Sequence, residues 1–174
     1  MADTIRARAD LLTLLANNTI GAIGAQDMRD VVVSLHGVYG MIYVDDGSTD
    51  QTGIGTALVK LTGFANNGIA VGTTPDHTND QITVGTAGVY LVGLQASFSG
   101  SILAEFKAYI YKNMANTGFG FHRKLGTLGD VGSASVAALV ALAANDTVSV
   151  YVASDGTNKT LRLVDGQLIV YRIA

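Results

Sequence analysis

The densest group of carboxylates in the sequence lies around Gly47 and comprises Asp45, Asp46 and Asp50. Carboxylate oxygens grouped around a glycine are typical of a calcium-binding loop. A loop of the EF-hand type also needs a distal bidentate glutamate, and the only glutamate of this chain is Glu105. We therefore interpret the segment as a solvated turn, with a cation site as the alternative, and we expect no metal and no cofactor.

The three histidines, His36, His77 and His122, lie far apart in the sequence and show no metal-ligand spacing. The sequence has no nucleophile-elbow motif around a serine, so it does not indicate a Ser-His-Asp catalytic triad. Hydrolysis of a polysaccharide needs two carboxylates about 5 to 10 Å apart. This chain has one glutamate, and most of its aspartates lie in predicted turns, so such a pair of carboxylates is not expected. We expect that the protein is not an enzyme, and a surface-polysaccharide hydrolase is the less favoured alternative.

Two short glycine motifs, at residues 53–55 and 118–120, lack the length of a dinucleotide-binding fingerprint. In and directly after the second motif, Phe119 and Phe121 alternate with glycines, so an aromatic face can approach a neighbouring subunit or a sugar ring. We interpret these two rings as core or subunit-interface residues, with ligand stacking as the alternative.

The chain that must position these residues carries little charge. Its 174 residues (18.0 kDa) are 14% charged and 48% hydrophobic, and the mean hydropathy is +0.34. A typical soluble chain has about 25% charged residues. Either uncharged polar residues provide the polar surface that charged residues usually supply, or other subunits cover part of the surface so that it need not be polar. We infer that the protein is an oligomer.

Net charge, apolar runs and cysteine content argue against several classes of protein. The net charge is −3 and the basic residues are scattered, which disfavours nucleic-acid binding. The longest apolar run, residues 136–144, is far shorter than the roughly 20 residues that span a bilayer, so we expect no membrane insertion. The chain has no cysteine and begins without the apolar region of a secretory signal, which fits folding in a reducing cytoplasm.

Two helices are predicted at the start of the chain. The first begins at Asp3 or Thr4 and ends at Ala16, and the second covers residues 26–35, with an aspartate in its first turn where the helix dipole favours an anion. We expect their apolar stripes to pack on another chain, with packing on the main domain as the alternative. Residues 1–40 are thus interpreted as an attachment segment, whose predicted contact residues are Ile5, Leu12, Leu15, Met28, Val31, Val32 and Leu35.

From residue 41 onward, short segments of period two, separated by Asp, Asn, Gly and Ser turns, predict an antiparallel sandwich or barrel. Residues 90–98 and 102–110 are predicted to pair as a hairpin with one core side. That side carries Tyr90, Val92, Leu94, Ala96, Phe98, Ile102, Ala104, Phe106, Ala108 and Ile110. Further strands are predicted at residues 41–44, 56–61, 81–84, 118–125, 131–142, 147–153 and 161–172, which gives nine or ten in total.

Two of these segments need a closer interpretation. Residues 136–144 suit a helix by propensity, but turn residues on both sides favour a strand, which we expect to be buried on both faces. In the last strand the leucines change from odd to even positions, which predicts a bulge or turn at Asp165-Gly166.

Several blocks of residues resemble one known family. They are Ile82-Thr83-Val84, Ala87-Gly88-Val89-Tyr90-Leu91-Val92, Ala96-Ser97-Phe98-Ser99-Gly100, Ala143-Ala144-Asn145-Asp146-Thr147-Val148-Ser149-Val150-Tyr151-Val152 and the closing strand that ends at Ile173-Ala174. Over residues 41–174 the chain resembles the C1q-like branch of the tumour-necrosis-factor-like jelly rolls. The resemblance implies an all-β, antiparallel jelly-roll β-sandwich of about ten strands, preceded by one or two short helices and assembled as a homotrimer. Animal members often bind calcium near the trimer apex, but no dense acidic cluster matches those loops here, so no metal site is implied.

A second resemblance concerns the attachment segment. Residues 17–32 look like the short helical segment that precedes fibre, spike or adhesion domains in virion proteins of tailed bacteriophages. The phrase Arg123-Lys124-Leu125-Gly126-Thr127, followed by Asp130-Val131-Gly132-Ser133, is similar to phage versions of the C1q-like domain. The combination implies a virion protein of a tailed phage or of a related gene-transfer particle, folded and assembled in the cytoplasm of the bacterial host.

We therefore expect a structural protein with two parts. Residues 1–40 would attach it to a capsid, portal or tail protein, and residues 41–174 would form a trimeric fibre, spike or decoration that projects from the particle. The trimer is expected to bind a host cell-surface glycan, because three weak sites act together. Reinforcement of the capsid or tail without a receptor is the alternative. The candidate loop residues are Asp46, Thr49, His77, Asn113, Asn116 and Asn158.

Overall fold

The computed structural model describes Asp10, Thr13 and residues 24–35, 37–127 and 130–174. The predicted first helix, with Ile5, Leu12 and Leu15, lies outside these residues apart from Asp10 and Thr13. The second helix is confirmed as α2 (Ala25–Leu35), which has Asp27 in its first turn. Asp27 accepts a hydrogen bond from the backbone N–H of Gly24, at 2.9 Å, and so helps to fix the start of this helix.

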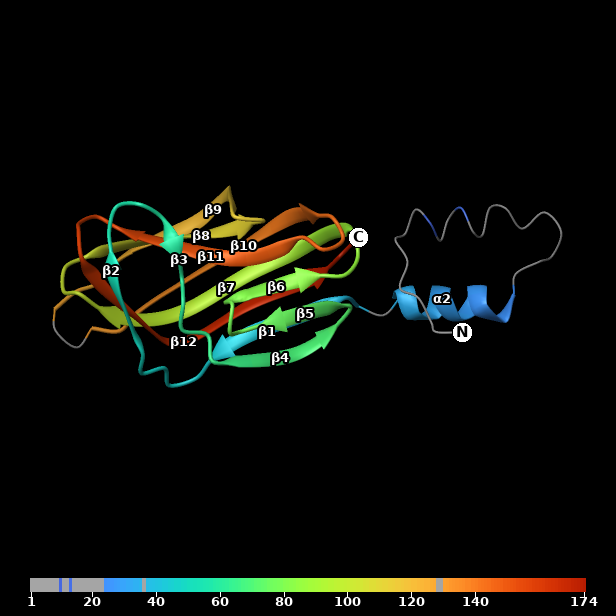
Figure 1. Cartoon of the computed structure of the whole chain (residues 1–174), viewed down its shortest axis with the longest axis horizontal. Coiled ribbons are helices and arrows are strands. Elements are labelled where there is room, and N and C mark those ends of the chain that lie inside the picture. Colours follow the sequence, from blue (N-terminus) through green and yellow to red (C-terminus); the bar gives the residue numbers. More distant parts are fainter. Residues whose placement is uncertain (1–9, 11–12, 14–23, 36, 128–129) are drawn as a thin grey trace.

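Residues 38–174 fold into a sandwich of two antiparallel sheets (Figure 1). Sheet A has the strand order β10-β7-β12-β1-β4, with β2 also paired to β12, and sheet B has the order β5-β6-β11-β8-β9, with β3 paired to β11. The strands are β1 (Tyr39–Val44), β2 (Asp50–Ile54), β3 (Val59–Lys60), β4 (Asn66–Val71), β5 (Thr73–Asp76), β6 (Gln81–Val84), β7 (Gly88–Gly100), β8 (Glu105–Lys112), β9 (Ala115–Lys124), β10 (Gly132–Leu142), β11 (Thr147–Ser154) and β12 (Lys159–Arg172). This arrangement confirms the predicted all-β jelly-roll sandwich.

Strict alternation of buried and outward side chains explains why the central segments form strands. The predicted core side of β7 is confirmed, because Tyr90, Val92, Leu94, Ala96 and Phe98 are all buried. On the facing sheet, β8 buries alternate residues in the same way. The two sets meet in one continuous core.

The predicted hairpin of residues 90–98 and 102–110 is wrong. Strand β7 pairs with β10 and β12 in sheet A, whereas β8 pairs with β11 and β9 in sheet B. The chain crosses from one sheet to the other after Gly100, so the two strands face each other across the core instead of lying edge to edge. Alternation predicts which face of a strand is buried, but it does not determine which strand lies beside it. Ile102 lies in the crossing loop and is exposed instead of in the core.

Other strand predictions need smaller corrections. The predicted strand at residues 56–61 is reduced to β3, and β2, β4 and β5 form in segments for which no strand was predicted, so the described residues contain twelve strands. Residues 136–144 do form a strand, β10 up to Leu142, but it is buried on one face only. The register change in the last strand is confirmed, and it lies between Leu163 and Asp165.

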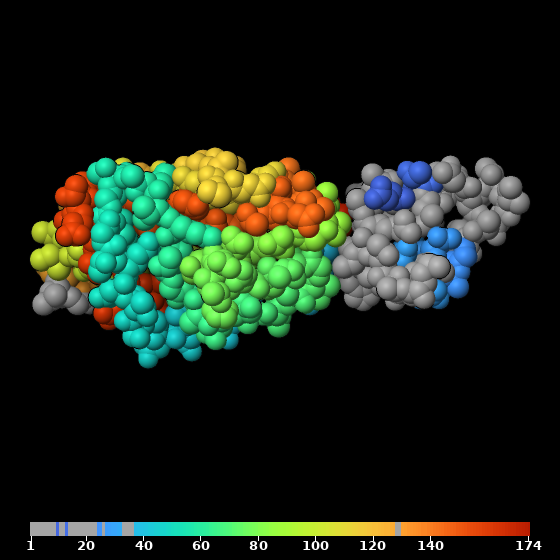
Figure 2. All heavy atoms as spheres, viewed as in Figure 1, coloured from blue at the N-terminus to red at the C-terminus, as the bar shows by residue number. Residues whose placement is uncertain are grey.

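The sandwich is elongated, and its two ends differ. At the Gly88 end of β7, the N–H of Val89 donates to the carbonyl oxygen of Ala174. We call this the terminal end, and α2 lies beyond it (Figure 1). The Gly100 end of β7 is the distal end, roughly 40 Å away at about 3.3 Å per residue. The segment from β2 to β3 crosses between the two sheets toward the distal end, as Figure 2 shows for its teal atoms.

Asp146 ties two turns together at the terminal end. Its carboxylate accepts hydrogen bonds from the N–H of Ala143 at 2.7 Å and from Nδ2 of Asn113 at 2.6 Å, and it lies 2.9 Å from Nζ of Lys112. Burial by itself raises the pKa of Asp146, but the hydrogen bonds from Lys112, Asn113 and Ala143 outweigh it and hold the pKa below its ordinary value of 3.8.

Asp146→Ala is expected to lower the free energy of unfolding by about 1–3 kcal/mol at pH 7, because it leaves its donors without an acceptor. Since the pKa is lower in the folded state, the stabilisation is fully present above the unfolded pKa and is lost as the pH falls through the folded pKa. Urea unfolding of the wild type and the variant between pH 6 and pH 2 measures this. The difference between them should shrink with falling pH, and a constant difference would contradict the assignment.

Candidate functional site

The outer face of sheet A, which points away from the core, is the candidate functional surface. The strand registers align its side chains in rows that cross β1, β12, β7 and β10. From the terminal end toward the distal end, the rows are Tyr39, Tyr171, Leu91 and Leu139; then Met41, Ile169, Gly93 and Ala137; then Tyr43, Gln167, Gln95 and Ser135; and finally Asp165, Ser97 and Ser133.

The first two rows form an apolar half of this face. They contain no charged side chain, and their polar atoms are limited to the two tyrosine hydroxyls. Leu139 is 58% exposed and Tyr171 is 46% exposed. Gly93 has no side chain and Ala137 has a small one, so another backbone or side chain can approach the middle of the face closely. A contiguous apolar surface of this kind is typical of an interaction site.

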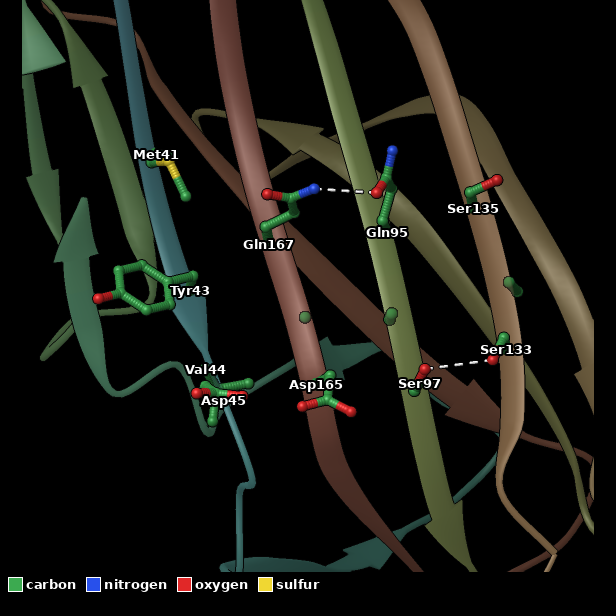
Figure 3. A pocket seen from close by; sticks show the side chains of 13 residues that line it. Met41, Tyr43, Val44, Asp45, Gln95, Ser97, Ser133, Ser135, Asp165 and Gln167 are labelled. Carbon is green, nitrogen blue, oxygen red and sulfur yellow. Dashed lines mark hydrogen bonds between the residues drawn. The ribbon is translucent and has the colours of Figure 1, made fainter. Parts of the chain in front are cut away.

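The last two rows form a polar half, which is hollowed into an open cleft of about 640 Å³ (Figure 3). Nε2 of Gln167 donates to Oε1 of Gln95 at 2.9 Å, and the hydroxyls of Ser97 and Ser133 lie 3.1 Å apart. These pairs join β12 to β7 and β7 to β10. They hold amide and hydroxyl groups facing the cleft, as the sticks in Figure 3 show.

The distal side of the cleft is acidic. Asp165 and Asp45 both line it and are exposed. Oδ1 of Asp165 accepts a hydrogen bond from the backbone N–H of Asp46 at 3.2 Å, and Asp46 has a left-handed backbone with φ of 52°. Within the described part of the chain, Oδ2 of Asp165 and the carboxylate of Asp45 accept no hydrogen bond. The cleft therefore offers acceptors for a cationic group.

The two phenylalanines of the 118–120 region have different environments. Phe121 is partly buried and stacks on Phe98, with ring centroids 6.1 Å apart, so it belongs to the core. Phe119 is 46% exposed on β9, the last strand of sheet B.

A second polar group lies on β8 and β9, which the pairing of these strands brings together. Nδ1 of His122 lies 3.2 Å from Oε1 of Glu105, and its Nε2 lies 3.0 Å from the hydroxyl oxygen of Tyr109. The order carboxylate, imidazole, hydroxyl is that of a proton relay, but none of the three residues lines the cleft. Nearly half of the His122 side chain is exposed. We interpret the group as cross-strand pairs that stabilise the sheet.

The candidate loop residues are divided between different parts of the sandwich. Asp46, Thr49 and Asn158 lie in loops toward the distal end. His77 lies in the turn between β5 and β6, where its N–H donates to Asn67. Asn113 is at the opposite end, bound to Asp146, and Asn116 lies within β9 instead of in a loop.

The attachment residues are described in part. Met28 and Val32, one helical turn apart on α2, are each 50% exposed, and Val31 is partly buried. The side chain of Leu35 lies outside the described residues. No helix among the residues described is long and apolar enough to cross a membrane. Among the same residues, no group of three or more His, Asp or Glu side chains is arranged to hold a metal ion.

Comparisons with known proteins agree with the fold. No protein-family model matches the sequence, and no curated protein matches it. The chain is similar in structure to the globular domain of zebrafish complement 1qA protein, with a TM-score of 0.52 and 12% identity over 79% of this chain and 98% of that one. Weaker similarities are found to Eiger TNF from S. frugiperda (TM-score 0.48, 16% identity, 79% and 93% covered) and to murine APRIL (TM-score 0.47, 11% identity, 78% and 99% covered). The zebrafish similarity supports the predicted C1q-like jelly roll.

Proposed function

We propose that this chain is a structural protein of a tailed-phage virion or a related gene-transfer particle, and that it acts as a homotrimer held together through the outer face of sheet A. The main support for the proposed trimer is the apolar half of that face. Its rows include half-exposed Leu139 and Tyr171 with no charged side chain among them. Covering such a surface with further copies of the chain would also compensate for the low charged fraction of the sequence, which is 14%.

A ring of copies around an axis parallel to the strands suits this face better than a twofold pair with antiparallel strands does. The face is apolar toward one end and acidic toward the other, so a twofold pair with antiparallel strands would place the apolar half of one copy on the acidic half of its partner. Such a ring keeps equivalent rows at one height, so that the apolar half of every copy lies near the terminal end of the assembly and the polar half lies toward its distal end.

The proposed attachment uses α2. Its half-exposed Met28 and Val32 form a short apolar stripe near the terminal end of the sandwich. We propose that this stripe binds a capsid, portal or tail protein, and that the distal end then points away from the particle. Asp46, Thr49 and Asn158 would be presented there to a host surface polysaccharide, with three weak sites acting together. The proposed role involves no catalysis.

The double variant Met28→Asp/Val32→Asp is expected to abolish incorporation into purified particles, because charged groups cannot be buried at an apolar contact without a partner. Quantitative immunoblotting of particles measures the incorporation, and light scattering of the isolated variant should give an unchanged mass. Ile102→Asp, in the exposed β7–β8 loop, is the matched control and should be incorporated normally. Normal incorporation of the double variant would contradict the attachment role.

The glycan part of the proposal has a separate test. Purified protein at micromolar concentration should compete with particles for adsorption to the host, and particles that lack the protein should adsorb poorly. Particles that adsorb normally but break more readily on heating would contradict receptor binding and assign the protein to reinforcement alone.

A further inference from the structure

A closed ring needs two different surfaces on every protomer, because each copy contacts its two neighbours through unlike patches. The outer face of sheet A is one of these patches. The second patch must lie at a side of the sandwich that can reach the same face on the next copy. The contact proposed below thus rests on the proposed trimer.

The side formed by β9 and β10 has the required properties. Strand β10 ends sheet A, strand β9 ends sheet B, and the two strands contact each other, so both sheet edges coincide at this side. The exposed residues there include Phe119 and Arg123, both on β9. An aromatic ring and a guanidinium on one edge are the residue types enriched at protein interfaces.

Arg123 lies at the same height as the acidic side of the cleft. Its side chain passes over Gly132, since a Cβ built on this glycine would come within 2.9 Å of Nε and 3.3 Å of Cγ of Arg123. Gly132 is the register partner of Phe98, and the next pair along these strands is Ser133 and Ser97. Asp165 stands in that same row, as the partner of Ser97.

The charges at this height are complementary and unused within one protomer. Among the described residues, the guanidinium of Arg123 makes no hydrogen bond and no ion pair. The same holds for the carboxylate of Asp45 and for Oδ2 of Asp165. In a ring whose strands run roughly along its axis, Arg123 of one copy and the two carboxylates of the next copy are brought to the same level.

We propose that the cleft on sheet A receives Arg123 of the neighbouring protomer, whose guanidinium pairs with Asp165 and Asp45. A guanidinium has five N–H donors in a planar fork, so it can pair with a carboxylate and still donate to the serine hydroxyls nearby. Contact through the apolar half of sheet A alone would leave the cleft in the polar half empty. The long side chain of Arg123 would fill part of this cleft. The cleft is then a specificity site that fixes the order and height of the three copies.

A charge exchange tests the pairing. Arg123→Asp and Asp165→Arg, made singly in the full chain, should each raise the trimer dissociation constant at least tenfold, because like charges would face each other across the interface. The double variant Arg123→Asp/Asp165→Arg should recover most of the wild-type affinity. Lys107→Asp, on β8 in sheet B and with the same change of charge, is the matched control and should remain trimeric. Analytical ultracentrifugation over a range of concentrations measures all of these variants, and circular dichroism checks that each is folded.

The outcomes separate this pairing from the proposed trimer. A trimer that persists in both single variants would overturn the pairing and leave the trimer intact. Single variants that dissociate without recovery in the double variant would also overturn it. A wild-type chain that is monomeric at every concentration would overturn the trimer itself. Recovery in the double variant, with an unchanged Lys107→Asp control, is the expected result.

Discussion

Leu139→Asp is expected to convert the trimer into a folded monomer. In one protomer the Leu139 side chain is 58% exposed and takes no part in the core, so the substitution should leave the sandwich intact. In the trimer it would place three carboxylates in an apolar contact. An unpaired charge that loses water in this way costs at least about 3 kcal/mol, and each 1.4 kcal/mol is a factor of about ten in affinity. We expect the dissociation constant to rise more than a hundredfold.

Light scattering after size exclusion measures the result of this substitution. The control is Ile102→Asp, which introduces the same charge at a comparably exposed leucine-sized residue of the distal loop and should leave the mass unchanged. Thermal unfolding followed by circular dichroism should show that Leu139→Asp still melts cooperatively. A variant that keeps the wild-type mass at low micromolar concentration would show that the apolar half of sheet A is not the contact surface.

Phe98→Ala is expected to give the largest loss of protomer stability. Phe98 is 3% exposed and joins the two sheets, with its ring 6.4 Å from Phe106 in an edge-on arrangement and 6.1 Å from Phe121 in a stacked one. Removing a buried phenylalanine costs about 3–5 kcal/mol through lost transfer free energy and the cavity that remains. That is a large part of the roughly 5–15 kcal/mol that stabilises a typical domain.

Urea unfolding at a fixed protein concentration measures this loss. Phe98→Leu keeps part of the apolar volume and should be destabilised less than the alanine variant. Ile102→Ala is the matched control, since its half-exposed side chain lies in the β7–β8 loop and contributes little to the protomer core. A loss below 1 kcal/mol for Phe98→Ala would contradict the central place of this ring in the core.

The strands that cross the centre of the sandwich could be predicted from the sequence, because their alternation is strict. In β7, five residues from Tyr90 to Phe98 are buried in turn, and the alternation identifies this face without knowledge of its neighbours. The pairing of β7 with β10 and β12 could not be predicted. It depends on contacts between segments far apart in the chain, and a local turn after Gly100 suggested a hairpin instead.

The candidate surface was only partly visible in the sequence. Residues 136–144 are apolar on both faces, which led to the prediction of a strand buried on both sides. In one protomer the face with Leu139 is exposed, and under the proposed function other copies of the chain cover it. Periodicity cannot tell burial within a protomer from burial between protomers, because both select apolar residues.

The cleft and the loop residues were hidden for a different reason. Gln95, Gln167 and Asp165 come from strands far apart in the sequence and meet only through the registers of β7 and β12. The candidate loop residues were selected by turn chemistry, which does not reveal the end of the sandwich to which a turn belongs. Asn113 instead donates a hydrogen bond to Asp146 at the terminal end, roughly 40 Å along the sandwich from the distal loops.

The solution mass of the full chain, measured by light scattering, tests the central claim most directly. We expect a mass of about 54 kDa, three times that of the 18.0 kDa chain, and we expect it to fall to the monomer mass in Leu139→Asp. A wild-type mass of 18.0 kDa at all concentrations up to about 100 μM would contradict the trimer, and with it the explanation of the apolar half of the sheet A face.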